Sequence, residues 1–199
     1  MLLCAAGGYQ AYALPHLILA LLKNFADDVQ VVLSPAAAKM TSKYAIEVAS
    51  RHPVYVEIDD HGPDVWVPHI ELSRNCDLIL VYPATASIIG KIANGIADEL
   101  IAATVLAATV PVFFVPIANT SMLEHPAMHR NIQRLRDDGY VVLPSPPALE
   151  IATREGLAEA GAAFPLPTLL TRMTAALKDP SLAAARRRAV GVDNPSATS

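Results

Sequence analysis

Cysteine and charged residues are scarce in this chain of 199 residues. The two cysteines, Cys4 and Cys76, each lie beside an apolar, strand-like run, which favours buried free thiols in a cytoplasmic protein over structural disulfides. Only 17% of the residues are charged, whereas 53% are hydrophobic. This balance indicates that much of the surface is buried against other subunits of an oligomer.

Long hydrophobic runs and an excess of positive charge are also missing. No apolar run reaches the roughly 18 residues that a membrane span needs, so no membrane partner is predicted. The first residues, MLLCAAGGYQ, have no basic region before the apolar run, which predicts a first strand and not a signal peptide. A net charge of −4 argues against nucleic acid as the main partner, and no metal site is predicted.

Strand-like and helix-like segments alternate along the chain. Strands are predicted at residues 1–6, 28–35, 54–58, 77–83, 110–116 and 140–146, and helices at 9–25, 36–52, 84–101, 125–139 and 168–179. The helix at 84–101 is predicted from apolar residues at four-residue spacing, namely Ile88, Ile92, Ile96 and Leu100. This alternation predicts an α/β fold that is Rossmann-like (flavodoxin-like), a three-layer α/β/α domain over residues 1–178 with a six-stranded parallel sheet.

Two segments near the C-terminus do not follow the pattern. Residues 144–167 are rich in Pro and Ala and have no clear period, and a loop of this length inside a compact domain is usually functional or disordered. Residues 179–199 hold few core-forming side chains and are predicted to be a mobile tail. The run Arg186–Arg188 in this tail is interpreted as a solvated charge cluster, and a partner-binding role stays open.

Small or polar residues follow several of the predicted strands. They are Gly7 and Gly8, Ser34, Thr85 and Ser87, and Asn119, Thr120 and Ser121. In an open parallel sheet, ligands bind beyond the carboxyl ends of the strands, and the free N–H groups of a helix start can hold a phosphate. An ordinary helix cap is an equally good interpretation of Ser34. A phosphate at one edge and a flat ring across the middle would use all these strand ends, and flavin mononucleotide (FMN) has that shape.

Two segments resemble the homo-oligomeric flavin-containing cysteine decarboxylases: HIELSRNCDLILVYPATASIIGKIANGIADELIAATVLA and FFVPIANTSMLEHPAMHRNIQRL. That family includes phosphopantothenoylcysteine decarboxylases and the peptidyl-cysteine decarboxylases of lantibiotic biosynthesis, of the epidermin type. Three family signatures line up in order within residues 1–145: an active-site histidine with His69, the Pro-Ala-Ser-Ala-Asn-Thr loop with PATASI before the KIANGIAD helix, and the Pro-x-Met-Asn motif with PIAN. Since family members assemble as trimers or dodecamers with flavin at subunit interfaces, the resemblance implies a homo-oligomer of one of these sizes.

The resemblance also implies roles for individual residues. His69 corresponds to the active-site histidine, although a lone histidine in an apolar context is more often structural. Asn119 corresponds to the asparagine that holds the substrate carboxylate, and Thr120, Ser121 and Met122 follow it as substrate contacts. Cofactor contacts are implied for Gly7, Gly8, Tyr9, Ser34, Pro83, Ala84, Thr85, Ala86 and Ser87. The implied cofactor is FMN, with the adenine dinucleotide (FAD) left open.

Several positions depart from the family pattern. Ile88 replaces a threonine, Ala118 stands where methionine usually precedes the asparagine, and Leu123 stands where a tryptophan often closes the motif. Gly8 replaces a common serine, so a phosphate contact there is limited to the backbone N–H. These changes indicate a divergent, specialised member.

The absence of cysteine beyond Cys76 bears on the reaction. The phosphopantothenoylcysteine enzymes reduce their enethiol with a cysteine well after the asparagine motif, so the resemblance implies that the reaction here stops at the enethiol. The predicted substrate is the C-terminal cysteine of a ribosomal precursor peptide, oxidised at its Cβ–Sγ bond and then decarboxylated. Residues 144–167 would be a flap over this peptide, and an inert loop is the alternative. A phosphopantothenoylcysteine decarboxylase of coenzyme A biosynthesis and a non-catalytic flavin-binding regulator remain alternatives.

Overall fold

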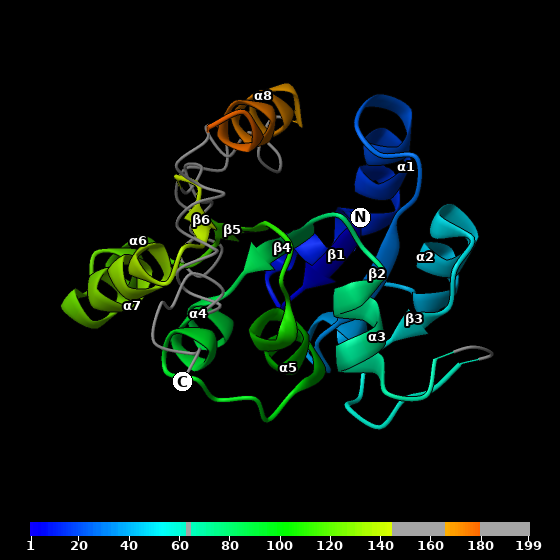
Figure 1. The fold of residues 1–199 in the computed structure, drawn as a ribbon, viewed down its shortest axis with the longest axis horizontal. Coiled ribbons are helices and arrows are strands. Elements are labelled where there is room, and N and C mark those ends of the chain that lie inside the picture. Colours follow the sequence, from blue (N-terminus) through cyan, green and yellow to red (C-terminus); the bar gives the residue numbers. More distant parts are fainter. Residues whose placement is uncertain (63–64, 145–165, 180–199) are drawn as a thin grey trace, which may run out of the picture.

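The computed structural model describes residues 1–62, 65–144 and 166–179. Its sheet contains β1 (Leu2–Ala5), β2 (Gln30–Leu33), β3 (Val54–Tyr55), β4 (Ile79–Ala84), β5 (Val112–Pro116) and β6 (Val141–Val142). The strands are all parallel, in the order β3-β2-β1-β4-β5-β6 (Figure 1). The predicted Rossmann-like fold with a six-stranded parallel sheet is therefore confirmed.

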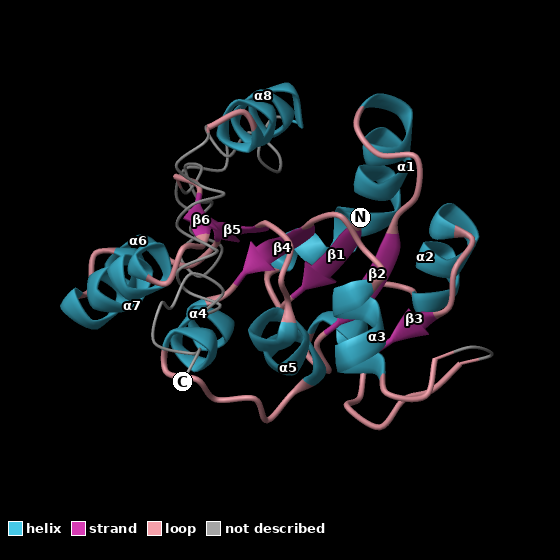
Figure 2. Cartoon of the chain, viewed as in Figure 1, coloured by secondary structure: helices cyan, strands magenta, loops and turns pink. Residues whose placement is uncertain are grey.

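Helices cover both faces of the sheet (Figures 1 and 2). One face carries α1 (Leu14–Asn24), α2 (Lys43–Ser50) and α8 (Leu166–Leu177). The other carries α3 (Pro68–Arg74), α4 (Ala86–Ala93), α5 (Leu100–Ala107) and α7 (Pro126–Asp137). On this second face the packing contacts run from α3 to α5, from α5 to α4, and from α4 to α7, so the helices form a row.

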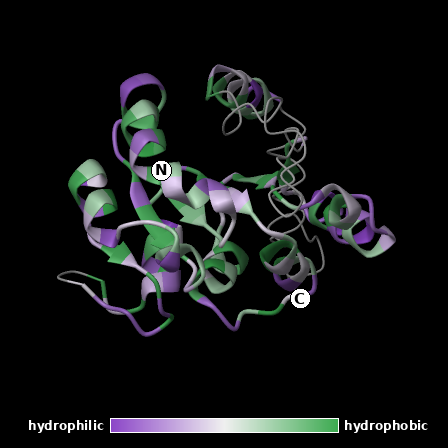
Figure 3. Ribbon diagram, turned by 180° about the vertical axis from the view of Figure 1, so that it is seen from behind, coloured by the Kyte–Doolittle hydropathy of each residue, from purple (hydrophilic) through white to green (hydrophobic). Residues whose placement is uncertain are grey.

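The side chains of each strand alternate between two hydrophobic cores. Leu3 and Phe113 point towards α1 and α8, whereas Leu2 and Phe114 point towards the row of helices on the other face. Burial of each such side chain contributes about 1.5–3 kcal/mol to folding. Because both faces are covered, the strands are continuous apolar runs, which Figure 3 shows as green arrows in the middle of the molecule.

The single helix predicted at 84–101 was wrong. Helix α4 ends at Ala93, and Gly95 adopts φ = +70°, the left-handed conformation that commonly terminates a helix. A new helix, α5, begins at Leu100. Ile96, predicted as part of the apolar stripe, is exposed in the connection between the two helices. The four-residue spacing of the apolar residues therefore continues by coincidence across the end of α4, where Gly95 permits the chain to leave the helix.

Other boundaries also differ from the prediction. The segment 36–52 forms a 3₁₀ turn (Ala37–Lys39) before α2, whose start is capped by Ser42. The segment 9–25 likewise begins as a 3₁₀ turn (Tyr9–Ala13). The short helices α3 and α6 (Thr120–Leu123) were not predicted, because they contain too few residues to show a period.

Parts of the predicted flap and tail lie outside the described residues. The structure describes Pro144 and then resumes at Leu166, and it ends at Asp179. The run Arg186–Arg188 therefore falls beyond the described chain. Over the described ranges, no helix combines the length and the hydropathy needed to cross a bilayer.

Candidate functional site

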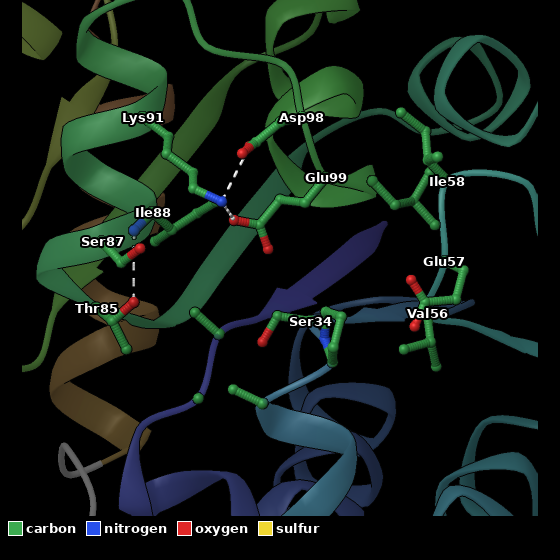
Figure 4. A pocket seen from close by; sticks show the side chains of 15 residues that line it. Ser34, Val56, Glu57, Ile58, Thr85, Ser87, Ile88, Lys91, Asp98 and Glu99 are labelled. Carbon is green, nitrogen blue, oxygen red and sulfur yellow. Dashed lines mark hydrogen bonds and ion pairs between the residues drawn. The ribbon is translucent and has the colours of Figure 1, made fainter.

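A cavity of about 560 Å³, here called the central cavity, lies beyond the carboxyl ends of β1, β2 and β4 (Figure 4). Its walls come from the segments that follow these strands, from residues 56–58 after β3, from α4 and from the start of α5. The strand order reverses direction between β1 and β4, which is where open parallel sheets bind their ligands. Its volume falls within the range of cofactor sites, about 300–1,000 Å³.

The loop after β1, which enters the central cavity at Gly7, passes very close to neighbouring residues. A Cβ atom added to Gly7 would lie 2.5 Å from the Cβ of Ala36, and one added to Gly8 would lie 2.9 Å from the Cβ of Pro83. Both distances are too short for real side chains, so glycine is needed for the loop after β1 to pass beside these residues. The Ser34 hydroxyl accepts a hydrogen bond from the Ala37 N–H at 3.1 Å, which makes Ser34 a helix cap as well as a lining residue.

The start of α4 forms one wall of the central cavity. Thr85 caps the helix, since its Oγ1 accepts a long hydrogen bond from the Ile88 N–H at 3.5 Å. The N–H groups of the first turn have no partner within the helix and carry the positive end of its dipole. Thr85 and Ser87 both line the central cavity, so this wall can donate hydrogen bonds to an anionic or polar ligand.

A second cavity, of about 490 Å³ and here called the lateral cavity, lies on the other side of the same turn. It is lined by Ala86, Ser121, Met122, His125, Ala127, Met128 and Asn131. Ala86 thus faces the lateral cavity while its neighbours Thr85 and Ser87 face the central one. The turn 85–87 borders both spaces, so ligands in the two cavities would be neighbours.

Asn119 lies next to the lateral cavity, at the start of α6. Its Oδ1 accepts hydrogen bonds from the Ser121 N–H at 2.8 Å and from the Ser121 hydroxyl at 2.5 Å. These two bonds hold the amide in one orientation, in which Oδ1 caps α6 and Nδ2 is the donor group of the side chain. Ser121 and Met122 extend from the same helix into the lateral cavity.

An ion-pair cluster occupies the wall of the central cavity opposite Ser34 (Figure 4). The Lys91 ammonium lies 2.9 Å from a carboxylate oxygen of Asp98 and 2.8 Å from one of Glu99. The hydrogen bond with Glu99, and then the bond with Asp98, raise the pKa of Lys91 above its usual value. Within the described ranges, no group of three or more His, Cys, Asp or Glu side chains is placed to hold a metal ion.

The predicted site residues fall into three groups. Gly7, Ser34, Thr85 and Ser87 line the central cavity. Ala86, Ser121 and Met122 line the lateral cavity. Gly8, Tyr9, Pro83, Ala84, Asn119 and Thr120 flank these residues along the chain without lining either space. Tyr9 is exposed and packs against Tyr12, with ring centroids 5.0 Å apart.

His69 is separate from the other predicted catalytic residue. It lies on α3 and lines neither cavity, and α5 and α4 stand between α3 and α7 in the row of helices (Figure 1). Its Nδ1 atom is buried and has no hydrogen-bond partner among the described residues. One copy of the chain therefore does not bring His69 and Asn119 together.

Sequence reasoning missed the ion-pair cluster of Lys91, Asp98 and Glu99. In the single helix that was predicted, residues eight positions apart would be separated by about 12 Å along the axis. The break at Gly95 brings Lys91 and Glu99 into contact instead. The sequence signal for this break was the dipeptide Asn94-Gly95, because Asn-Gly is common in turns.

Comparisons with known proteins relate the chain to a family and to solved structures. A family model described as Flavoprotein matches residues 1–173. The chain is 42% identical over 141 residues to the coenzyme A biosynthesis bifunctional protein CoaBC of Bacillus subtilis (strain 168), covering 70% of this chain and 34% of that protein. It therefore spans about one third of the length of this relative.

Solved structures with the same architecture include enzymes of similar size. The FMN-dependent cysteine decarboxylase SpaF is 30% identical with a TM-score of 0.68, over 81% of this chain and 96% of that chain. The peptidyl-cysteine decarboxylase EpiD is 30% identical with a TM-score of 0.63, over 71% of this chain and 83% of that chain.

Proposed function

This chain belongs to the Flavoprotein family, and from that premise we propose that it is an FMN-dependent enzyme that oxidatively decarboxylates the C-terminal cysteine of a ribosomal precursor peptide. The predicted cofactor, FMN, is confirmed by the family match together with the FMN-dependent neighbour. The peptide substrate is inferred from EpiD and from the absence of cysteine beyond Cys76. The product would be an enethiol that can enter an aminovinyl-cysteine ring.

The central cavity fits a flavin mononucleotide. At its end beside Gly7 and Ser34, the absence of a side chain on Gly7 leaves room for a phosphate, and the Ser34 hydroxyl can donate a hydrogen bond to it. The first turn of α4 contributes further donors through the segment 85–87. Small side chains on this segment leave room for a flat ring system. These residues would hold the cofactor, which acts as the two-electron oxidant when bound.

The observation that carries the proposal is that the turn 85–87 borders both cavities. A cofactor in the central cavity and a cysteine side chain in the lateral cavity would meet across this turn. Asn119, fixed by its two bonds to Ser121, lies beside the lateral cavity and would donate from Nδ2 to the substrate carboxylate. The lateral cavity therefore supports a carboxylate-bearing substrate next to the cofactor.

The reaction needs a base close to the substrate thiol. Oxidation of the Cβ–Sγ bond removes two electrons and two protons from the cysteine and leaves a thioaldehyde. When carbon dioxide then leaves Cα, the C=S group accepts the released electron pair. His69 would take the proton from the thiol or from Cβ, which an imidazole can do near neutral pH.

Because His69 is remote from Asn119 in one chain, the proposal includes a homo-oligomer in which His69 reaches the site of a neighbouring copy. The surface before α3 supports this arrangement. Trp66 is 81% exposed, its chain neighbour Val67 is exposed as well, and so is Ile58, eight residues earlier. A monomer gains nothing from such exposed apolar side chains, whereas a subunit interface would bury them.

Phosphopantothenoylcysteine decarboxylation in coenzyme A biosynthesis is the second candidate. It is favoured by the 42% identity to CoaBC, which is higher than the identity to EpiD. Both reactions begin with a cysteine carboxylate, so the two cavities are compatible with either. They differ in the group attached to the cysteine nitrogen and in whether the enethiol is reduced.

The test is mass spectrometry of two substrates incubated in air with the purified flavin-loaded protein. A peptide that ends in cysteine should lose about 46 mass units, carbon dioxide plus two hydrogens, while phosphopantothenoylcysteine should be a poor substrate. Loss of about 44 units from phosphopantothenoylcysteine alone, with the peptide intact, would establish the second candidate instead. Failure of both substrates with flavin bound would favour a non-catalytic regulator.

A further inference from the structure

The Lys91 cluster closes one side of the central cavity by joining two helices. Lys91 lies in the last turn of α4, and Asp98 and Glu99 lie just before α5. The connection folds back on α4, since the Ile96 N–H donates to the Lys91 carbonyl at 2.9 Å. The two ion pairs of Lys91 then hold the end of the connection against the same residue. Lys91 therefore fixes the wall that Glu99 and Leu100 present to the cavity.

Glu99 is the more shielded of the two carboxylates. Its side chain is 17% exposed, whereas that of Asp98 is 58% exposed. An ion pair that is partly removed from water is screened less by solvent and salt than an exposed one. The interaction of Lys91 with Glu99 should therefore dominate, in agreement with its place as the main cause of the raised pKa of Lys91.

The charges around the central cavity are mostly negative. Glu57, Asp98 and Glu99 line it, and Lys91 is the only cationic side chain among the described residues that do so. FMN carries a phosphate with nearly two negative charges at neutral pH, whereas riboflavin carries none. Without the Lys91 ammonium, three carboxylates would face the anionic cofactor. A lysine ammonium is protonated at neutral pH, and the two ion pairs raise the pKa of Lys91 further.

We propose that Lys91 is a positioning residue that limits the repulsion between the acidic wall of the central cavity and the phosphate of anionic FMN, a repulsion that uncharged riboflavin does not feel. It does so by offsetting one of the two negative charges of Glu99 and Asp98 and by holding both side chains in the wall formed with α5. This inference depends on FMN as the cofactor and not on the substrate. A wrong substrate in the proposed reaction would therefore leave it intact.

The experiment is a titration of the flavin-free full-length chain with FMN and with riboflavin, followed by quenching of flavin fluorescence. Lys91→Met should weaken FMN binding about tenfold and riboflavin binding less than about threefold, because only the charged ligand feels the unmatched carboxylates. The loss for FMN should shrink at high salt, where the repulsion is screened.

Matched variants separate charge from shape. Lys91→Arg keeps the charge and should retain the FMN affinity. Lys23→Met removes the same unit charge from an exposed site at the end of α1 and should leave both affinities unchanged. Adding Glu99→Gln to Lys91→Met removes one of the two carboxylates that lost their partner and should recover part of the lost FMN affinity.

Glu99→Gln alone provides a second measurement if Lys91→Met folds poorly. With Lys91 intact, loss of this negative charge should strengthen FMN binding about threefold and leave riboflavin binding nearly unchanged. Equal losses for both ligands in Lys91→Met would show a scaffolding role only and would overturn the proposal. So would an unchanged FMN affinity, or a failure of Glu99→Gln to alter the ratio of the two affinities.

Discussion

The central and lateral cavities differ in the way they are built. The central cavity is formed by strand ends, glycines and helix starts, and its Ser34 is only 6% exposed. The lateral cavity is formed mainly by side chains of α6 and α7, and its Met122 is 49% exposed. The central cavity thus reaches the core at Ser34, Ile88 and Leu100, whereas Met128 is the only buried residue among those described that line the lateral cavity.

The central cavity is therefore a preorganised site, whereas the lateral cavity needs a ligand or a neighbouring subunit to complete it. Backbone groups held by the sheet lose little entropy when they bind a ligand, and this suits a tightly held cofactor. Exposed side chains such as Met122 must be ordered by an occupant or by a neighbouring subunit. Changes to the central cavity should therefore alter flavin binding, and changes at the lateral cavity should alter turnover with flavin still bound.

The largest expected effect comes from His69→Ala. Loss of a general base lowers turnover by about 10²–10⁴-fold, while flavin absorbance per chain should stay unchanged because His69 lines neither cavity. Peptide decarboxylation by mass spectrometry is the measurement. If His69 serves a neighbouring copy, refolding a mixture of His69→Ala and Asn119→Ala chains should recover part of the activity. Mixed chains that stay inactive would contradict a shared site.

A smaller loss is expected from changes to Asn119. Asn119→Asp keeps an oxygen that can accept the Ser121 N–H and cap α6, but it replaces the amide donor with a negative charge. Repulsion of the substrate carboxylate should raise KM and lower kcat/KM by roughly 10²-fold. Steady-state kinetics with a cysteine-terminated peptide would measure this. A purely structural Asn119 would instead leave Asp nearly as active as Asn.

Gly7→Ala tests the loop after β1 that enters the central cavity. The new methyl group would lie 2.5 Å from the Cβ of Ala36 and must displace the turn beside it, at a cost of about 1–3 kcal/mol. FMN affinity and the denaturant midpoint should both fall. Gly90→Ala is the matched control, because its Cβ would meet only Asn131 at 3.5 Å, and a mid-helix alanine should stabilise the protein by about 0.5–1 kcal/mol. The idea fails if both variants behave alike.

The smallest effect is expected from Thr85→Ala. Its hydroxyl caps α4 through a long bond of 3.5 Å, so its removal should lower the free energy of unfolding by about 0.5–1 kcal/mol. Flavin affinity should fall modestly as well, because the residue lines the central cavity. Thr85→Ser keeps the hydroxyl and should behave like the parent in a denaturant titration. If Thr85→Ala lowered flavin affinity as much as Gly7→Ala does, the Thr85 cap and not the glycine would organise the site.

Much of the central cavity could be predicted from the sequence, whereas the relation between its residues and the catalytic ones could not. Gly7, Ser34 and Thr85 follow strands directly, and the ends of parallel strands meet at one edge of the sheet. His69 precedes a strand on a short helix, so its sequence position gives no direction in space. Lys91 was missed because one wrong helix placed it far from Glu99.

The sequence by itself determined the parallel sheet, the alternation of its layers and the polar strand ends. Buried strands are long apolar runs and their period is local, so neighbouring residues suffice to identify them. Only the tertiary structure decided that Ala86 faces one cavity and its neighbours another, and that Lys91 reaches across a loop to Asp98 and Glu99. These relations depend on a backbone reversal at Gly95 and on packing between distant segments, which no local pattern records.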